Sequence, residues 1–201
     1  MDVTPTRSFV LEQKEERRAM QEGYVFLDEK CLLLAGEMLR ELARYATQQR
    51  EFAAAWDAAL AALGAALGRH GLSGLEVYPP SADPGARVKR ETRSLMGVRL
   101  QDAAYVAGMP VAAAAVDRSP EAEACRRAFE ALLPHATAQA AVTGNLERLQ
   151  QEYRRAVRRA RALQDVLLPE LDRTVAEIET RLEEAEQEDA IWMRRGAGTT
   201  A

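Results

Sequence analysis

The sequence predicts a mainly α-helical protein, in which a long antiparallel two-helix coiled coil carries a small β-containing insert (the foot) between its helices. Two observations lead to this prediction. Apolar residues recur at steps of three and four towards both ends of the chain, which is the spacing of a coiled-coil seam. Between these ends lies a stretch rich in glycine and proline, which is typical of turns and short strands.

The composition favours the same fold class. Of the 201 residues, 47% are apolar but only 5% are aromatic, and alanine supplies much of the apolar count. Charged residues make up 29%, and the formal net charge is −4. Such a composition is typical of long helices with narrow apolar contacts. The acidic balance argues against a nucleic-acid-binding protein, which would usually be basic.

The first helix is expected within residues 1–70, with Thr4 or Thr6 as its N-cap and Pro5 near its first turn. At 1.5 Å per residue, a helix over Phe9–Leu67 would span roughly 90 Å, so it must project beyond any small domain. Its apolar seam consists of Met20, Tyr24, Leu27, Cys31, Leu34, Met38, Leu42, Tyr45, Phe52, Trp56, Leu60, Leu63 and Leu67.

The foot is expected at residues 71–119. Glycines from position 64 onwards are expected to end the first helix, and two proline-containing turns follow it. Short apolar runs between these signals predict two or three strands, with a hairpin as one arrangement of them. The glycines are Gly64, Gly68, Gly71 and Gly74, and the turns are Pro79-Pro80 and Pro84-Gly85. The apolar runs are Leu75–Tyr78, Leu95–Leu100 and Tyr105–Val116.

The second helix is expected at residues 120–194. The run Asp117-Arg118-Ser119-Pro120, followed by two glutamates, is a strong helix start. Pro134 is expected to break or kink the helix, and residues 195–201 are expected to be a disordered tail. The seam of this helix consists of Leu146, Leu149, Tyr153, Ala156, Ala160, Leu163, Leu167, Leu171, Val175, Ile178, Leu182, Ala185, Asp189 and Trp192.

The spacing of this seam changes near Pro169, where one extra residue makes a local 11-residue repeat that unwinds a left-handed supercoil. A proline inside a helix also removes one backbone donor and crowds the carbonyl of the residue four positions earlier, here Asp165. Two interpretations are open: a tolerated kink, or a built-in curve that makes the coiled coil asymmetric.

Both helices lead to the foot, so they are expected to be antiparallel, with both termini at the opposite tip. Pairing Phe9 with Met193 would place Cys31 opposite Leu171. Trp192 and Met193 then either close the last layer of the seam or contact an apolar surface of a partner.

Charge is segregated along the second helix. The basic cluster is either a solvated face or a contact with an acidic partner, and an acidic run over Glu170–Asp189 follows it. The cluster consists of Arg154, Arg155, Arg158, Arg159 and Arg161.

The sequence predicts no catalytic, cofactor-binding or metal-binding residue. It contains no Gly-Lys dipeptide, so the phosphate-binding loop Gly-x-x-x-x-Gly-Lys-Ser/Thr is absent. His70 and His135 lack ligands at metal-site spacing and are expected on the surface or in loops. Cys31 and Cys125 are interpreted as ordinary thiols of a reducing compartment. No 18-residue apolar run or apolar leader is apparent, so no membrane span and no signal peptide are predicted.

Short motifs spread over both helices and the insert resemble those of the D subunit of V-type and archaeal-type rotary ATPases, which forms their central rotor shaft. The motif residues are Pro5, Thr6, Arg7, Gly23, Lys30, Gly97, Arg99, Arg158, Arg159, Pro169, Thr174, Arg181, Glu183 and Glu184. One departure lies in the first helix, where the family's Lys-x-Lys-Arg-Asp cluster is reduced to Asp28-Glu29-Lys30-Cys31-Leu32.

The resemblance implies a non-catalytic rotor subunit that transmits torque between ATP chemistry and ion movement. At the tip, the implied partners are the catalytic and non-catalytic nucleotide-binding subunits of the hexameric head. At the foot, they are the small F subunit of the central stalk and the funnel-shaped subunit on the membrane rotor ring. The implied location is cytoplasmic and peripheral to the membrane, without direct membrane insertion. Two other hypotheses fit paired helices: a prefoldin-like coiled-coil chaperone and a coiled-coil tether.

Overall fold

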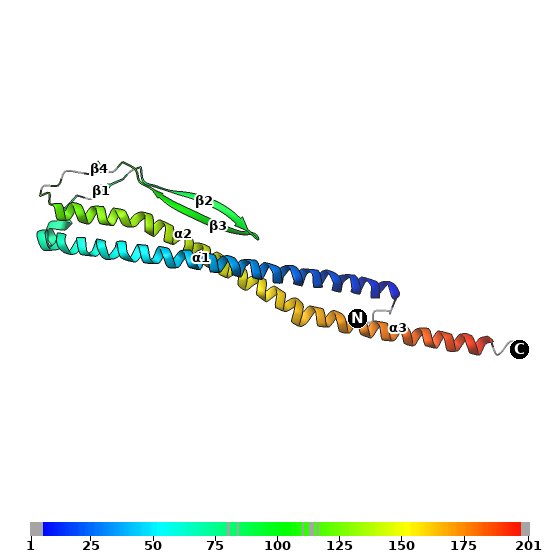
Figure 1. Cartoon of the computed structure of the whole chain (residues 1–201). Helices are drawn as coiled ribbons and strands as arrows, with labels where there is room; N and C mark the ends of the chain where they lie inside the picture. Colours follow the sequence, from blue (N-terminus) through cyan, green and yellow to red (C-terminus); the bar gives the residue numbers. More distant parts are fainter. Residues whose placement is uncertain are drawn as a thin grey trace. The chain divides into compact units, whose positions relative to one another are not determined.

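The computed structural model describes residues 6–79, 81–83, 85–109, 111–112, 115 and 117–197. The chain is mainly helical, with two long helical stretches that are separated in the sequence by four strands, which pair into two two-stranded antiparallel sheets (Figure 1); this confirms the predicted fold class. The elements are α1 (Arg7–Glu76), β1 (Ser81–Ala82), β2 (Arg87–Leu95), β3 (Val98–Val106), β4 (Val111–Ala112), α2 (Pro120–Ala162), the π-helix η1 (Leu163–Leu167) and α3 (Leu168–Ala197). Pro5, Pro80 and Pro84 lie outside the described residues.

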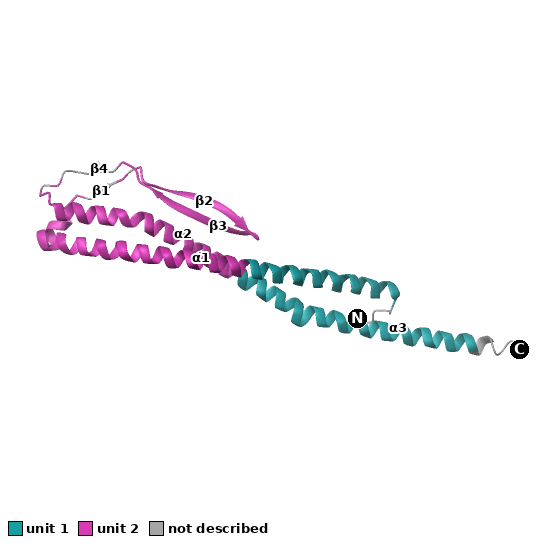
Figure 2. Cartoon of the chain, viewed as in Figure 1, with its two compact units in different colours: residues 1–33, 153–201 teal, residues 34–152 magenta. Residues whose placement is uncertain are grey.

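The chain divides into two compact units (Figure 2). Unit 1 comprises Met1–Leu33 and Tyr153–Ala201, and unit 2 comprises Leu34–Glu152. Helices α1 and α2 each contribute residues to both units.

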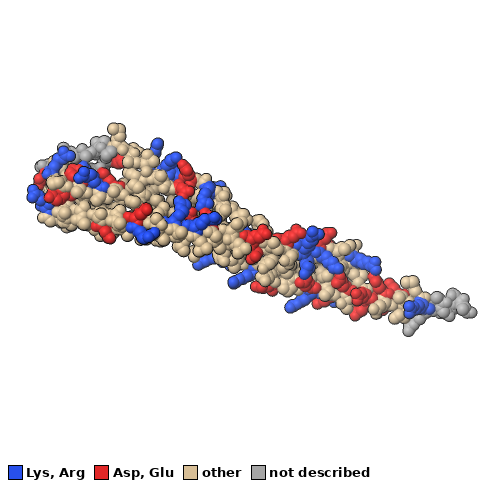
Figure 3. All heavy atoms as spheres, viewed as in Figure 1, with Lys and Arg blue, Asp and Glu red and all other residues tan. Residues whose placement is uncertain are grey.

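In unit 1, the start of α1 lies antiparallel to α3. Thr6 caps α1, because its hydroxyl oxygen accepts a hydrogen bond from the backbone N–H of Phe9 at 3.3 Å. Three ion pairs join the two helices and fix their alignment: Arg7 with Glu186, Lys14 with Glu179, and Arg17 with Asp172. Figure 3 shows basic and acidic side chains together over this unit.

These ion pairs show that the predicted pairing of Phe9 with Met193 is wrong. Arg7 lies opposite Glu186, so α3 is displaced by roughly 13 Å along its axis from the predicted register. The end of α3 therefore runs past the first residue of α1, as Figure 1 shows. Helix α3 also continues to Ala197, three residues into the predicted tail; residues 198–201 lie outside the described part of the chain.

The seam of the second helical stretch shifts at η1. Leu167, predicted to be buried, is 38% exposed, whereas its neighbour Leu168 is 8% exposed. In η1 the backbone N–H of Leu168 donates to the carbonyl of Leu163, five residues earlier instead of four. This wider turn contains the extra residue that the spacing predicted near Pro169. As a result, the buried seam position at this turn is Leu168 instead of Leu167.

In unit 2, α1 and α2 pack through small and aliphatic side chains. The most buried apolar residues on these helices include Ala59, Ala66, Val142 and Leu149. Several large residues predicted in the seam are instead exposed: Leu42, Trp56 and Leu60. Small side chains allow close helix contact, and the spacing pattern alone cannot choose between alanine and its larger neighbours.

Strands β2 and β3 form a regular antiparallel hairpin from Arg87↔Val106 to Leu95↔Val98, while β1 pairs with β4. The hairpin turn is Met96-Gly97, with φ of 47° and 86°, as a two-residue turn with left-handed residues requires. The hairpin itself was foreseen as one arrangement, but two of its strand positions were wrong: Leu95–Leu100 contains the turn, and Leu75–Glu76 belongs to α1. Strand β2 is charged and exposed, so it lacks the apolar alternation used for the prediction.

The helix boundaries in unit 2 differ from the prediction at two places. Gly64 and Gly68 lie within α1, and only Gly71 leaves helical geometry, with φ 65° and ψ 174°. Pro134 does not break α2, which is helical throughout Pro120–Ala162. The predicted start of α2 is confirmed: Ser119 caps it, accepting a hydrogen bond from Ala122 N–H at 3.1 Å.

Helix α1 contains one 18-residue stretch that is apolar enough to cross a membrane by length and composition, with a mean hydropathy of 1.2. A stretch of this kind is weak evidence for a membrane span, since helices of soluble proteins pass the same test. It is not an uninterrupted apolar run, because every 18-residue stretch of α1 contains at least one charged residue.

Candidate functional site

The hairpin is attached to the helices of unit 2 by a cluster of charged and amide side chains, here called the polar clamp. It contains Glu37, Glu41 and Arg44 from α1, Arg93 from β2, Asp102 from β3 and Asn145 from α2. Two of its carboxylates and its amide are buried, which is costly unless each is paired. Undocking the hairpin would remove partners from these buried groups, so the clamp favours the docked arrangement.

The buried carboxylates share their cationic partners. Arg93 Nη2 donates to both Glu37 and Glu41, at 3.2 Å for Glu41. Arg44 joins α1 to the hairpin, because its two terminal nitrogens donate to Glu41 Oε1 at 2.8 Å and to Asp102 Oδ1 at 2.6 Å. Burial alone would raise the pKa of Glu37, but the hydrogen bond and charge of Arg93, with the charge of Arg40, outweigh burial and hold that pKa below its usual value.

Asn145 completes the clamp by acting as a short strand partner for β3. Its Oδ1 accepts from the backbone N–H of Gln101 at 2.8 Å, and its Nδ2 donates to the Gln101 carbonyl at 2.9 Å. The same Nδ2 also donates to Glu41 Oε2 at 3.2 Å. One buried amide thus satisfies the free edge of β3 and a buried carboxylate.

Asn145→Ala is expected to release the β3 edge. The amide of Gln101 should then exchange with solvent at least about tenfold faster, because its acceptor is lost. Leu100 and Asp102 should change less, since alternate residues of an antiparallel strand point towards the neighbouring strand. Residue-resolved hydrogen exchange by NMR measures this, with Thr143→Ala on the same helix as control. Unchanged Gln101 exchange in Asn145→Ala would contradict the assigned role.

Acid is expected to weaken the clamp through Glu37. Its folded pKa is below its unfolded value of about 4.3, so the stability it contributes is present above about pH 4.3 and is lost as the pH falls through the folded pKa. Guanidinium unfolding between pH 7 and pH 3 should show a smaller loss of stability for Glu37→Gln than for the unchanged chain. Parallel curves for the two proteins would show that Glu37 carries no such linkage.

A second cluster closes the junction between α1 and α2. The side chain of His70, predicted on the surface or in a loop, is only 5% exposed; its Nε2 lies 2.6 Å from Ser119 Oγ, and its Nδ1 lies 3.7 Å from Asp117 Oδ2. This order of groups resembles a serine–histidine–aspartate triad. However, Ser119 is buried and caps α2, so the arrangement ties two helix ends together and presents no accessible nucleophile. His135 is half-buried, with Nδ1 3.9 Å from Glu51.

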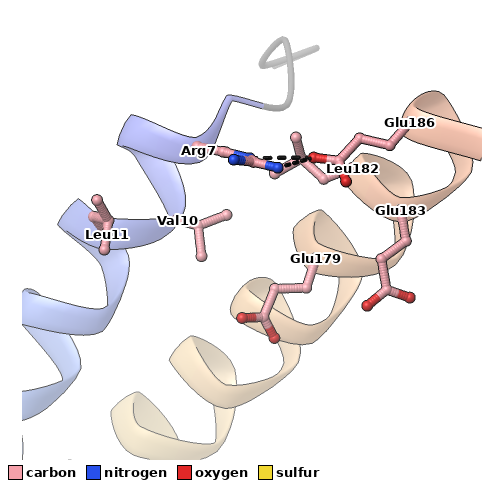
Figure 4. Close-up of a pocket in the computed structure, with 7 residues that line it drawn as sticks. All are labelled: Arg7, Val10, Leu11, Glu179, Leu182, Glu183 and Glu186. Carbon is pink, nitrogen blue, oxygen red and sulfur yellow. Dashed lines mark hydrogen bonds and ion pairs between the residues drawn. The ribbon is translucent and has the colours of Figure 1, made fainter. Parts of the chain in front are cut away.

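At the start of α1, unit 1 carries an open groove of about 310 Å³ between α1 and α3 (Figure 4). Val10, Leu11 and Leu182 supply its apolar lining, and Arg7 reaches across it to Glu186 with two hydrogen bonds, at 2.6 and 3.1 Å. The remaining lining residues are Glu179 and Glu183. This groove, here called the tip groove, is an acidic and apolar surface.

Beyond the groove, α3 exposes three large apolar side chains. Ile191, Trp192 and Met193 are exposed, Trp192 by 73% and Met193 by 72%. Trp192 and Met193 therefore do not close a layer of the seam against α1, which begins opposite Glu186.

The other predicted residues are distributed as follows. Leu34 and Val175 are buried, and the half-buried seam residues are Leu27, Cys31, Met38, Leu163, Leu171, Ile178 and Leu182. Gly23 packs closely, since a Cβ there would lie 3.8 Å from Leu163 Cδ1. The hydroxyl of Thr174 donates to the Glu170 carbonyl at 2.9 Å. The exposed charged motif residues are Arg7, Arg99, Arg158, Arg159, Arg181, Glu183 and Glu184, while Lys30 is half-buried.

Neither metal binding nor thiol chemistry is supported by the described part of the chain. Among residues 6–79, 81–83, 85–109, 111–112, 115 and 117–197, no group of three or more His, Cys, Asp or Glu side chains could hold a metal ion. Cys31 and Cys125 are free thiols. Burial raises the pKa of both, and in Cys31 the nearby Asp28 carboxylate raises it further, which makes these thiols less reactive.

Comparison with known proteins identifies the family of this chain. The family model for the D subunit of ATP synthase matches residues 10–195. The chain belongs to the ATP synthase D-subunit family. The match spans both helical stretches and the insert, so the predicted resemblance to the D-subunit family is confirmed.

Individual members of the family are similar over almost their full lengths. The D subunit of the A-type ATP synthase of Pyrococcus furiosus is 27% identical, with 97% of this chain and 93% of the relative covered. The A-type D subunit of Methanopyrus kandleri is 28% identical, over 96% of this chain and 85% of the relative. The D subunit of the V-type ATP synthase of Thermotoga neapolitana is 24% identical, over 97% of both chains. As a family member, the chain is a component of a V/A-type ATPase complex.

The polar clamp of this ATP synthase component was not predicted from its sequence. Glu37 and Glu41 lie four residues apart on the seam side of α1. Because they are charged, a search for regularly spaced apolar residues does not detect them. A usable signal was present: each is followed three residues later by an arginine, and Arg40 and Arg44 pair with them at 2.8 Å. Acidic residues at seam positions with arginines one turn on indicate buried ion pairs.

Proposed function

We propose that this chain is the non-catalytic central-stalk rotor of a V/A-type ATPase or ATP synthase, and that it transmits torque between the nucleotide-binding head and the ion-translocating membrane rotor. The observation that carries the proposal is the family match over residues 10–195 of a chain in which each of the two units contains a pair of helices. A paired coil resists bending and twisting better than a single helix. Changes of nucleotide affinity with rotor angle would couple binding to conformation.

The two units suit different partners. The tip, with the tip groove and the exposed Trp192 and Met193, would lie within the hexameric head of catalytic and non-catalytic nucleotide-binding subunits. The hairpin end would meet the small F subunit of the central stalk and the funnel-shaped subunit on the membrane rotor ring. The polar clamp supports this role, because its ion pairs and hydrogen bonds attach the hairpin to both α1 and α2. The protein would be cytoplasmic and peripheral to the membrane.

Phosphate release tests the proposal. The purified chain alone should release no phosphate from ATP, in keeping with a sequence that has no phosphate-binding loop. Hydrolysis by the catalytic hexamer of its complex should depend on this chain: phosphate release is compared for the hexamer with and without the chain in its central position. ATP hydrolysis by the clean isolated chain, or failure to bind the hexamer, would refute it; binding to unfolded clients instead would favour a chaperone.

A further inference from the structure

Helix α1 carries a second apolar surface in unit 1, opposite its seam. Val25, Phe26, Leu32 and Leu33 are 46–69% exposed. At 100° per residue these four share one face of the helix, while Leu27 and Cys31 lie on the other. We call these four residues the outer stripe; it spans about 12 Å along the helix axis.

The outer stripe has acidic residues within it and beside it. Glu22, Val25, Phe26 and Glu29 line an open hollow of about 320 Å³, together with Gln21. Glu22 is paired with Arg18 at 3.1 Å, a pair in which both side chains are exposed. Asp28 adds a further exposed carboxylate. A group binding here would meet an apolar floor with negative charge along its sides.

An apolar surface with acidic sides suits a partner that is apolar on one face and basic at its edges. We propose that the outer stripe of α1 docks a basic amphipathic helix of another protein chain, with an apolar side chain in the hollow and a Lys or Arg beside Glu29. A helix fits because the apolar residues recur over two turns, the spacing at which helices interlock. Large apolar residues on both faces of one helix indicate that both faces are covered in the working protein.

Charge argues against a second copy of this chain as the occupant. Two copies joined through the outer stripe would bring Glu22, Asp28 and Glu29 of one against the same carboxylates of the other. Like charges so placed are unfavourable. A basic helix reverses the sign of every one of these contacts, and the choice does not depend on which complex contains the chain.

Site-specific photocrosslinking in the native complex tests this proposal. A benzoylphenylalanine replaces Phe26 in the full-length chain, expressed in its own cells, and the crosslinked peptide is identified by mass spectrometry. The expected peptide comes from another protein, carries net positive charge and has apolar residues spaced by three and four. Glu29→Lys should lower the crosslink yield about fivefold or more, whereas Glu15→Lys, an exposed residue of the same helix, should leave it within about twofold.

Circular dichroism confirms that each variant remains helical, and Leu33→Ser provides a second disruption that adds no charge and should also lower the yield. No crosslink, an acidic peptide, a peptide from a second copy, or equal yields for Glu29→Lys and Glu15→Lys would overturn the proposal. A basic helix from a protein outside any ATP synthase would support the docking surface while contradicting the proposed function. A rotor that still turns but gives no crosslink would contradict the docking surface while supporting the proposed function.

Discussion

Replacing Glu41 by alanine is expected to lower the free energy of unfolding by about 3–5 kcal/mol, because it removes one partner from a buried charge cluster. Glu41 is buried and contacts Arg44, Arg93 and Asn145, so these groups would lose an acceptor that water cannot easily replace. The measurement is guanidinium unfolding followed by circular dichroism.

The matched control for this prediction is Glu15→Ala, which removes an exposed glutamate from the same helix. Its effect should stay within about 0.5 kcal/mol. If Glu41→Ala were no more damaging than Glu15→Ala, the polar clamp would not stabilise unit 2, and the hairpin would have to be held by its apolar residues alone.

Leu149→Ala is the second substitution with a large expected effect. Leu149 lies on α2 and is fully buried, so its truncation should cost about 2–5 kcal/mol through lost burial and the cavity left behind. Leu133→Ala makes the same chemical change on the same helix at a position that is exposed. It should cost far less, and thermal or guanidinium unfolding compares the two directly. Equal losses would mean that the apolar contact between α1 and α2 has been assigned to the wrong face.

Much of the fold could be predicted because paired helices require apolar residues at regular steps of three and four along the sequence. The steps of three and four identified both helical stretches, and the Ser119-Pro120 start of α2 is a local signal that needs no tertiary information. The extra residue near Pro169 was also visible in the spacing. Its structural form was not, because a π-turn and a kink both accommodate such a residue, and only the bond from Leu168 to Leu163 distinguishes them.

The failures share a physical cause: apolar spacing reports nothing about charged residues that become buried or paired. Glu37 and Glu41 lie where a seam residue would lie, but their burial depends on Arg93, which comes from a strand more than fifty residues away in the sequence (Glu37 to Arg93, a separation of 56). Strand β2 was missed for the same reason: its charged residues are exposed, and Arg93 pairs with Glu37 and Glu41 of α1. The helix register depended on ion pairs at the tip, which spacing alone could not align.

The central claim, that this chain is a rotor, is tested most directly by observing rotation. The catalytic hexamer is fixed to a surface, and a bead is attached to the exposed hairpin through Ser94→Cys, in a chain whose two natural cysteines are replaced by serine. The account predicts that ATP drives the bead in one direction and that rotation stops when ATP is removed. ATP hydrolysis by the assembled complex with a bound but stationary bead would contradict the account.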